Sequence, residues 1–152
     1  MNHPRYTIRD ADWDDDRLAL THVRRVVFMQ EQGVPAELEW DADDAVSRHF
    51  LAEDDAGHPI GTARLLPDGH IGRMAVLEFW RRQGVGTALM RHVLAAARDA
   101  GFPMVELAAQ THALRFYERF GFESCGDEFM DAGIPHRHMR LVLSESSAAR
   151  EA

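Results

Sequence analysis

The sequence predicts one α/β (α+β) domain over residues 1–152, with helices on the faces of a mixed, mostly antiparallel central sheet. Two observations lead to this fold class. A chain of 152 residues with 45% hydrophobic and 28% charged residues is large enough to bury a core of its own. Strand-like and helix-like patterns alternate along it, and no repeat or long linker divides it.

The first half of the chain is expected to form a strand, a helix and three further strands. Alternating residues over 5–10 predict the opening strand. After it, Asp12 or Asp14 is expected to cap a helix. The apolar face of that helix is expected to comprise Trp13, Leu20, Val23 and Val27. Residues 31–45 indicate a loop with a short helical turn. Turn signals then separate two strands of a hairpin and a third strand over 70–76.

The second half is expected to alternate helices and strands. Apolar residues at helical spacing predict a helix over 85–100, with Gly101 as its C-cap. A short strand over 103–109 follows, and a helix over 111–120 comes after it. Two closing strands are expected over the segments FESCGD and HRHMRLVL. The polar tail, residues 144–152, is expected to be flexible.

Composition narrows the class of protein. A net charge of −8 argues against a nucleic-acid-binding protein, which needs a basic face. No apolar run reaches the roughly 20 residues that cross a bilayer, and the first residues do not resemble a secretory signal. Cys125 is the single cysteine, which excludes an intrachain disulfide and suits a reducing compartment. We therefore expect a cytoplasmic protein.

The stretch RRQGVGTALM, residues 81–90, places Gly-x-Gly after two arginines and at the start of a predicted helix. It lacks the lysine and spacing of a Walker loop. A dinucleotide-binding fingerprint needs a third glycine where Leu89 stands and a closer preceding strand. Backbone N–H groups at such a helix start suit a pyrophosphate, and Arg81 and Arg82 add charged donors. On spacing alone, a glycine-rich turn with solvated arginines fits equally well.

Four stretches resemble the motifs of one superfamily. Arg81-x-x-Gly84-x-Gly86 resembles the Q/R-x-x-G-x-G/A signature of the GNAT superfamily of acyl-CoA-dependent N-acetyltransferases, and AAQTHALRFYERFGF resembles its C-terminal motif. More narrowly, VRRVVFMQEQGVP…ELEWDADD…RHFLA and DAGIPHRHM look like the ElaA-like branch. The resemblance spans about residues 5–143. It implies a GNAT-type sheet and transfer of an acetyl group from acetyl-CoA to an amine.

The resemblance also implies roles for individual residues. The pantetheine arm of the coenzyme would lie along backbone groups of Met74, Ala75 and Val76. The pyrophosphate would be held by Arg81, Arg82, Gln83, Gly84, Val85, Gly86 and Thr87. The other side of the coenzyme would contact Gln110, Ala113, Phe116, Tyr117 and Arg119. Many family members have asparagine where Gln110 stands. The backbone N–H of Val76 or a neighbour would bind the oxyanion if its strand carries the family's bulge.

Acetyl transfer to an amine requires a base, an oxyanion donor and an acid for the leaving thiolate. Tyr117 is the candidate acid, because it aligns with the tyrosine that has this role in many GNAT enzymes. Its alternative role is core packing at helical spacing with Leu114 and Phe120. Glu31 is the candidate base and a candidate acceptor-binding residue. Its rivals are the nearby acidic residues Glu37, Glu39, Asp41 and Asp44.

His136 and His138 form a His-x-His pair on one face of a predicted strand. Two histidines can bind zinc, but no third or fourth ligand accompanies them, so we predict no metal site. His136 stands in the GIPH run and is a candidate for the acceptor pocket. His49 and His112 are expected to be structural.

The acceptor class stays open between a small-molecule amine and a peptide amine. We expect direct transfer, because no well-placed nucleophile indicates a covalent intermediate. Two alternatives are a GNAT-fold module that senses acyl-CoA without turnover and a dinucleotide-binding protein. Dimers are common in the superfamily, so a homodimer is one assembly to test.

Overall fold

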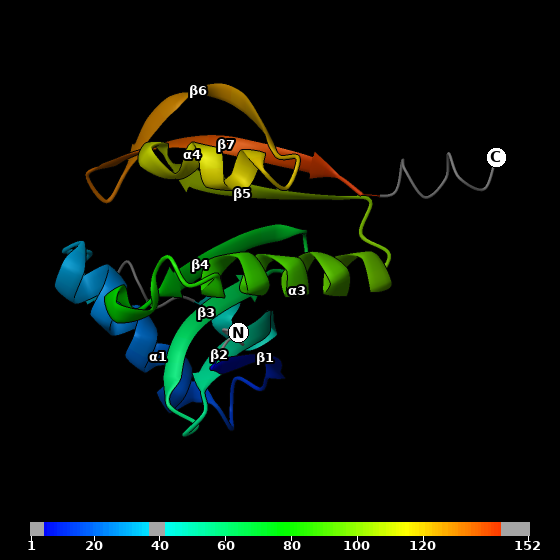
Figure 1. Ribbon diagram of the computed structural model, residues 1–152. Helices are drawn as coiled ribbons and strands as arrows, with labels where there is room; N and C mark the ends of the chain where they lie inside the picture. The colour runs from blue at the N-terminus through cyan, green and yellow to red at the C-terminus, as the bar shows by residue number, and fades with distance from the viewer. Residues whose placement is uncertain (1–4, 37–41, 144–152) are drawn as a thin grey trace.

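A seven-stranded sheet forms the centre of the computed structural model, which describes residues 5–36 and 42–143 (Figure 1). The strand order is β1-β2-β3-β4-β5-β7-β6. The strands are β1 (Tyr6–Ala11), β2 (Arg48–Asp54), β3 (Pro59–Leu65), β4 (His70–Val76), β5 (Met104–Gln110), β6 (Glu123–Asp131) and β7 (Ile134–Val142). Among the described strands, β4 and β5 are the one parallel pair of neighbours. The predicted mixed, mostly antiparallel sheet is confirmed.

The helices follow the expected order along the chain. They are α1 (Arg17–Arg24), the π-helix η1 (Arg25–Glu31), the 3-10 helices η2 (Ala42–Val46), η3 (Glu78–Trp80) and η4 (Thr111–Ala113), and the α-helices α3 (Val85–Asp99) and α4 (Leu114–Glu118). Residues 37–41 and the predicted tail 144–152 lie outside the described residues. Within the described part of the chain, none of the helices is long and apolar enough to cross a bilayer.

The start of α1 differs from the prediction. The helix begins at Arg17, after Asp16 in the N-cap position, so neither Asp12 nor Asp14 caps it. The carboxylate of Asp16 accepts a hydrogen bond from the backbone N–H of Asp12 at 2.8 Å and pairs with Arg9 at 2.8 Å. Tertiary pairing with β1 therefore ties down this loop, and the sequence pattern of caps did not show it.

Helix α3 covers the sheet with the apolar residues that its spacing predicted. Val85, Leu89 and Val93 are almost fully buried against the strands. The helix ends as expected, since Gly101 has a left-handed φ of 83° just beyond it. In Figure 1, α3 crosses in front of the sheet beside β4, and its N-terminus lies at the side on which β4 and β5 separate.

Strands β4 and β5 pair over a very short distance. The pairs His70↔Glu106 and Ile71↔Leu107 join them. Beyond this point β4 stays with β3, while β5 continues along β7 as far as Gln110. Figure 1 shows the two strands diverging toward the left. The sheet therefore opens in its middle.

A β-bulge lies on β4 at this opening. Where β3 has the single residue Ala63, β4 has Arg73 and Met74. Arg73 has a left-handed φ of 49°, and its carbonyl accepts a hydrogen bond from Thr62 Oγ1 at 3.0 Å. An oxyanion-binding N–H at Val76 or a neighbour was predicted only if this strand has a bulge. The structure shows the bulge, and the role of the N–H stays a prediction.

The closing hairpin is longer than predicted. Its strands extend to Asp131 and from Ile134, and Ala132 and Gly133 turn between them with positive φ angles of 52° and 77°. An irregularity between Cys125 and Phe129 interrupts the register of β6. Irregular pairing of this kind hides the period-two pattern that sequence analysis relies on.

A buried ion cluster attaches α1 to the sheet. The Asp44 carboxylate accepts hydrogen bonds from Arg24 at 2.9 and 3.1 Å and from Arg64 of β3 at 2.9 Å. All three side chains are buried. Trp13, which precedes α1 and is not part of it, stacks on His49 and lies 5.6 Å from the Arg24 guanidinium. His49 is structural as expected, since its Nε2 is 2.8 Å from the Asp44 carbonyl oxygen.

The cluster determines the charge state of Asp44. Burial raises the pKa of its carboxyl, but hydrogen bonds and charges from Arg24 and Arg64 outweigh burial and hold that pKa below its usual range. Asp44 was also a rival candidate base. That role is wrong, because its carboxylate is enclosed in the cluster and is not among the residues that line the site described below.

Replacing Asp44 by Asn is expected to lower the free energy of unfolding by about 3–5 kcal/mol, because it removes the buried carboxylate charge with which the guanidinium groups of Arg24 and Arg64 pair. Urea unfolding at pH 7 measures the difference. Since folding lowers the pKa below the unfolded value of about 3.9, the stabilisation is present above that pH and is lost as pH falls through the folded pKa. Asp55→Asn, in an exposed turn, should change stability by less than about 0.5 kcal/mol. Equal effects of the two variants would contradict the prediction.

Candidate active site

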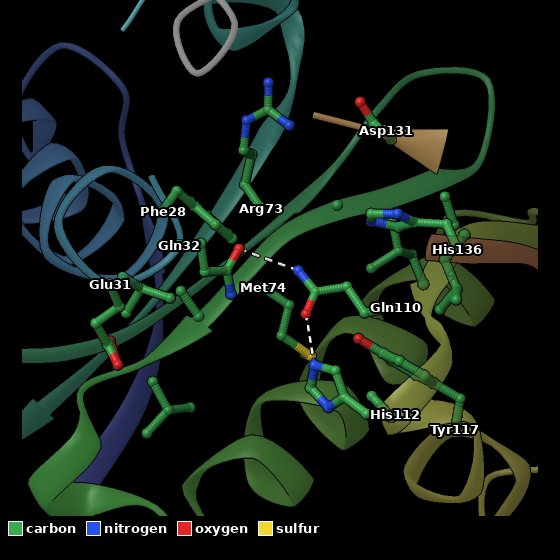
Figure 2. A pocket seen from close by; sticks show the side chains of 18 of the residues that line it. Phe28, Glu31, Gln32, Arg73, Met74, Gln110, His112, Tyr117, Asp131 and His136 are labelled. Atoms are coloured by element: carbon green, nitrogen blue, oxygen red, sulfur yellow. Dashed lines mark hydrogen bonds between the residues drawn. The ribbon is translucent and has the colours of Figure 1, made fainter. Parts of the chain in front are cut away.

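A cavity of about 600 Å³ occupies the opening between β4 and β5 (Figure 2). Its walls come from η1, the bulged part of β4, the end of β5, η4, α4, the end of β6 and the first part of β7. Of the residues selected from the sequence, the cavity wall contains Glu31, Met74, Ala75, Val76, Arg81, Gln110, Ala113, Tyr117 and His136. The structure therefore brings the candidate acid, the candidate base and the candidate pantetheine strand to one place.

The first helix reaches this cavity as a π-helix. After Arg24 its hydrogen bonds shift to a wider turn, which continues to Glu31. Phe28, Glu31 and Gln32 face the cavity from this segment. The apolar spacing predicted a helix here, but a change from four-residue to five-residue hydrogen bonds has no signature in the sequence.

The loop before α3 has the geometry of an anion-binding turn. Arg82 and Gly84 have left-handed φ angles of 65° and 86°, and the helix begins directly afterwards at Val85. A Cβ at Gly84 would lie 3.2 Å from the Tyr6 hydroxyl, which itself donates a 3.3 Å hydrogen bond to the Gln83 carbonyl. Glycine is therefore needed here for both φ and space. The first N–H groups of α3 have no carbonyl within the helix to bond and can receive an anion.

Arg81 faces the cavity rather than this turn. Its Nε donates to the Val76 carbonyl at 2.9 Å, and its Nη2 donates to Glu31 Oε1 at 2.6 Å. The Arg81 guanidinium is thus bonded to groups at the edge of β4. If Arg81 binds the pyrophosphate as predicted, its backbone N–H is the group left to do so. The remaining selected arginines, Arg82 and Arg119, are exposed.

Tyr117 packs against the core and also lines the cavity. Its ring packs edge-on against Phe116 and Phe122, with ring centres 5.0 and 6.1 Å away. Its hydroxyl points into the cavity beside Gln110 and His112 (Figure 2). Burial raises the pKa of the phenol to about 12, so the hydroxyl keeps its proton at neutral pH.

A hydrogen-bonded chain spans the cavity. Gln110 Nε2 donates to Gln32 Oε1 at 3.0 Å, and Gln110 Oε1 lies 2.7 Å from His112 Nε2 (Figure 2). This chain connects η1 with the end of β5, across the gap between the two halves of the sheet. Gln32 was not selected from the sequence, since glutamine at a helix end carries no pattern, and His112 was expected to be only structural.

His136 and His138 have different surroundings despite their shared strand. His136 is buried and lines the cavity, whereas His138 is exposed and stacks on Phe129 with ring centres 4.4 Å apart. In the part of the chain that the structure describes, no group of three or more His, Cys, Asp and Glu side chains is placed to hold a metal ion. Asp131 also lines the cavity and was missed, because its strand was predicted to end earlier.

Not every rival base can be placed. Glu37, Glu39 and Asp41, with the aromatic Trp40, lie outside the described residues. Arg73 and Phe28 line the cavity, although neither was selected as a site residue. The bulge positions Arg73, and no sequence pattern predicts a bulge.

The model of a family described as an acetyltransferase (GNAT) domain matches residues 18–143. The chain belongs to the GNAT acetyltransferase family. The chain is 40% identical over 122 residues to the uncharacterized N-acetyltransferase YjcF of Bacillus subtilis (strain 168), covering 78% of this chain and 86% of that protein.

Solved structures of other GNAT proteins superimpose on the whole domain. An acyl-CoA N-acyltransferase from Pseudomonas aeruginosa aligns with a TM-score of 0.80 and 32% identity, covering 89% of this chain and 98% of that chain. ElaA from Escherichia coli aligns with a TM-score of 0.78 and 30% identity, covering 88% and 98%. The predicted GNAT membership and likeness to ElaA are confirmed. The chain therefore has an acyltransferase domain of the GNAT family, and members of this family use an acyl-CoA together with an amine acceptor.

The turn before α3 leads to a prediction about acyl-CoA binding. A Cβ at Gly86 would lie 3.4 Å from Phe116 and 4.0 Å from Val76, which is ordinary contact. Gly86→Ala should therefore bind acetyl-CoA nearly as well as wild type. Gly86→Val places two more methyl groups at the first turn of α3 and should weaken binding more than about 100-fold, or about 2.7 kcal/mol. Calorimetry measures both, and unchanged affinity of the valine variant would exclude this turn as the pyrophosphate site.

Proposed function

We propose that this GNAT protein transfers an acetyl group from acetyl-CoA directly to an amine, without a covalent enzyme intermediate. The observation that carries the proposal is Tyr117, whose protonated hydroxyl points into the cavity between β4 and β5. A neutral phenol at this place can supply the proton that a leaving thiolate needs.

The residues that would hold acetyl-CoA follow from the shape of the site. The pantetheine arm would lie along the backbone of Met74, Ala75 and Val76, because these residues line the cavity and β4 pairs with β5 only through His70 and Ile71. The pyrophosphate would sit at the start of α3, held by backbone N–H groups from the stretch Arg81, Arg82, Gln83, Gly84, Val85, Gly86 and Thr87. Gln110, Ala113, Phe116 and Arg119 would lie along the other side.

Four groups of the chain would then face the reacting atoms. A backbone N–H next to the bulge, at Val76 or a neighbour, would stabilise negative charge on the thioester oxygen. Tyr117 would donate its proton to the departing sulfur. Glu31 and His136 would face the amine, and both line the cavity.

Direct transfer is supported by the composition of the cavity wall. Its described residues include no cysteine, serine, threonine or lysine to accept the acetyl group. Cys125 lies on β6, outside this wall.

A screen of thiol release from acetyl-CoA tests the function. Polyamines, amino sugars, amino acids and lysine peptides would each be added to the purified protein, with enzyme-free reactions as the control. We expect release above background with at least one amine class, and mass spectrometry should find the acetylated amine. Acetyl-CoA binding by calorimetry without release for any class would favour a sensor, and NAD binding in place of acetyl-CoA would favour the dinucleotide alternative.

Tyr117→Phe is expected to lower kcat about 100-fold or more while the dissociation constant of acetyl-CoA changes little, because the variant removes the proton and keeps the ring. The only other tyrosine in the sequence, Tyr6, provides the matched control. Tyr6→Phe removes a hydrogen bond to the Gln83 carbonyl and should affect binding more than kcat. Wild-type turnover in Tyr117→Phe would remove Tyr117 as the acid.

A further inference from the structure

We propose that His136 is the proton acceptor for the amine, and that a small pocket beside it holds the amine. The inference rests on the proposed acetyl transfer. It assigns the role of base to His136 in place of Glu31. From the sequence, His136 was only a candidate for the acceptor pocket.

A hydrogen bond to the backbone fixes the tautomer of His136. Its Nδ1 lies 2.7 Å from the carbonyl oxygen of Ile134. A carbonyl oxygen can only accept a hydrogen bond, so Nδ1 must carry the hydrogen. The neutral ring therefore has its lone pair on Nε2, which makes Nε2 a proton acceptor.

The ring of His136 is held in the wall of the main cavity. His136 is 8% exposed, lies opposite Gln110 on the neighbouring strand and packs beside the Phe129 ring, whose centre is 5.8 Å away. Figure 2 shows the imidazole extending from β7 toward the cavity. The ring is thus held by one hydrogen bond and one aromatic contact, and it faces the space where the reaction is proposed to occur.

A second cavity of about 100 Å³ adjoins the main cavity, and His136 lines both. The residues common to both are Phe28, Gln32, Arg73, Gln110, Asp131 and His136. The hydrogen bond from Gln110 to Gln32 joins two of these shared residues, so it lies at the boundary. An amine in the small cavity would meet the acyl group of the main cavity there.

Among the other ionisable groups of the main cavity, Glu31, Tyr117 and His112 are less suited to accept a proton. Glu31 Oε1 is in an ion pair with Arg81 at 2.6 Å. Burial raises the pKa of Tyr117 to about 12, so this residue is an acid at neutral pH. His112 is exposed and does not line the small cavity, and its Nε2 carries a hydrogen that it donates to the Gln110 oxygen. Asp131 of β6 and Arg73 of β4 are the charged groups that share both cavities with His136.

In the proposed step the ammonium loses two protons, one to His136 and one to Tyr117. The ammonium gives one proton to His136 Nε2, and its nitrogen attacks the thioester carbon, so that a C–N bond forms as the C–S bond breaks. The sulfur takes the Tyr117 proton, and the second proton of the attacking nitrogen restores the Tyr117 hydroxyl. His136 then releases its proton to solvent.

The test replaces His136 by Asn, which keeps a donor near the Ile134 carbonyl and removes Nε2. The matched control is His138→Asn, two residues along the same strand and outside both cavities. The acceptors are the primary amine with the highest turnover in the screen and methoxyamine, whose nitrogen is unprotonated at neutral pH. Calorimetry with acetyl-CoA and thermal unfolding accompany the rates.

We expect His136→Asn to lower kcat/KM for the primary amine about 100-fold or more, with unchanged acetyl-CoA affinity and a much smaller loss for methoxyamine. His138→Asn should behave as wild type. Equal losses for both amines, or no loss, would overturn the inference while the proposed function stands. A wild-type protein inactive with every amine would overturn the proposed function.

A second measurement requires no variant. Nitrogen-15 NMR of the wild-type protein, recorded at a pH high enough to make the ring neutral, should show hydrogen on Nδ1 of His136 and none on Nε2. A neutral ring protonated on Nε2 would overturn the inference even if His136→Asn did not fold.

Discussion

The parallel contact between β4 and β5 is limited to two residue pairs, and the site depends on this limit. Two strands that stayed paired would bury their facing backbone groups in a continuous ladder. Here the bulge at Arg73 and Met74 bends β4 away, and β5 follows β7 instead. The separation opens a cavity in the middle of the domain with strand backbone on its walls. Backbone that is held rigid yet unpaired can bind a chain-like ligand such as pantetheine without the entropic cost of ordering a loop.

One wall of that cavity depends on a second interaction, far from the chemistry. Helix α1 is attached to β3 through Asp44, which lies between Arg24 and Arg64. The helix continues as η1, so its attachment also determines where Glu31 and Gln32 lie. A buried ion cluster is a weak source of net stability, because desolvation offsets most of its attraction. The geometry of the cluster is specific, however, so it fixes the position of α1. A site built from several elements requires such a fixed helix position.

The site also shows how residue types acquire roles from their surroundings. His136 and His138 are chemically identical, but His136 is buried against the cavity with a fixed tautomer, whereas His138 is exposed. Glu31 is the carboxylate that the sequence favoured, yet Arg81 occupies one of its oxygens. Tyr117 packs against other aromatic rings, and its hydroxyl also reaches the cavity. These differences come from contacts between segments that lie far apart in the chain.

The sequence by itself determined the order of the elements, the α3 core face of Val85, Leu89 and Val93, and the family, since local periodicity and motif spacing are properties of the chain. It also predicted the glycine turn before α3. Tyr117 stood out in the sequence as the candidate acid. Only the tertiary structure decided the bulge at Arg73, the π-helical turn that carries Gln32, the burial of Asp44 and the pairing of Glu31 with Arg81. Each of these depends on which distant residue lies opposite, and a pattern read along one segment holds no information about its partner in space.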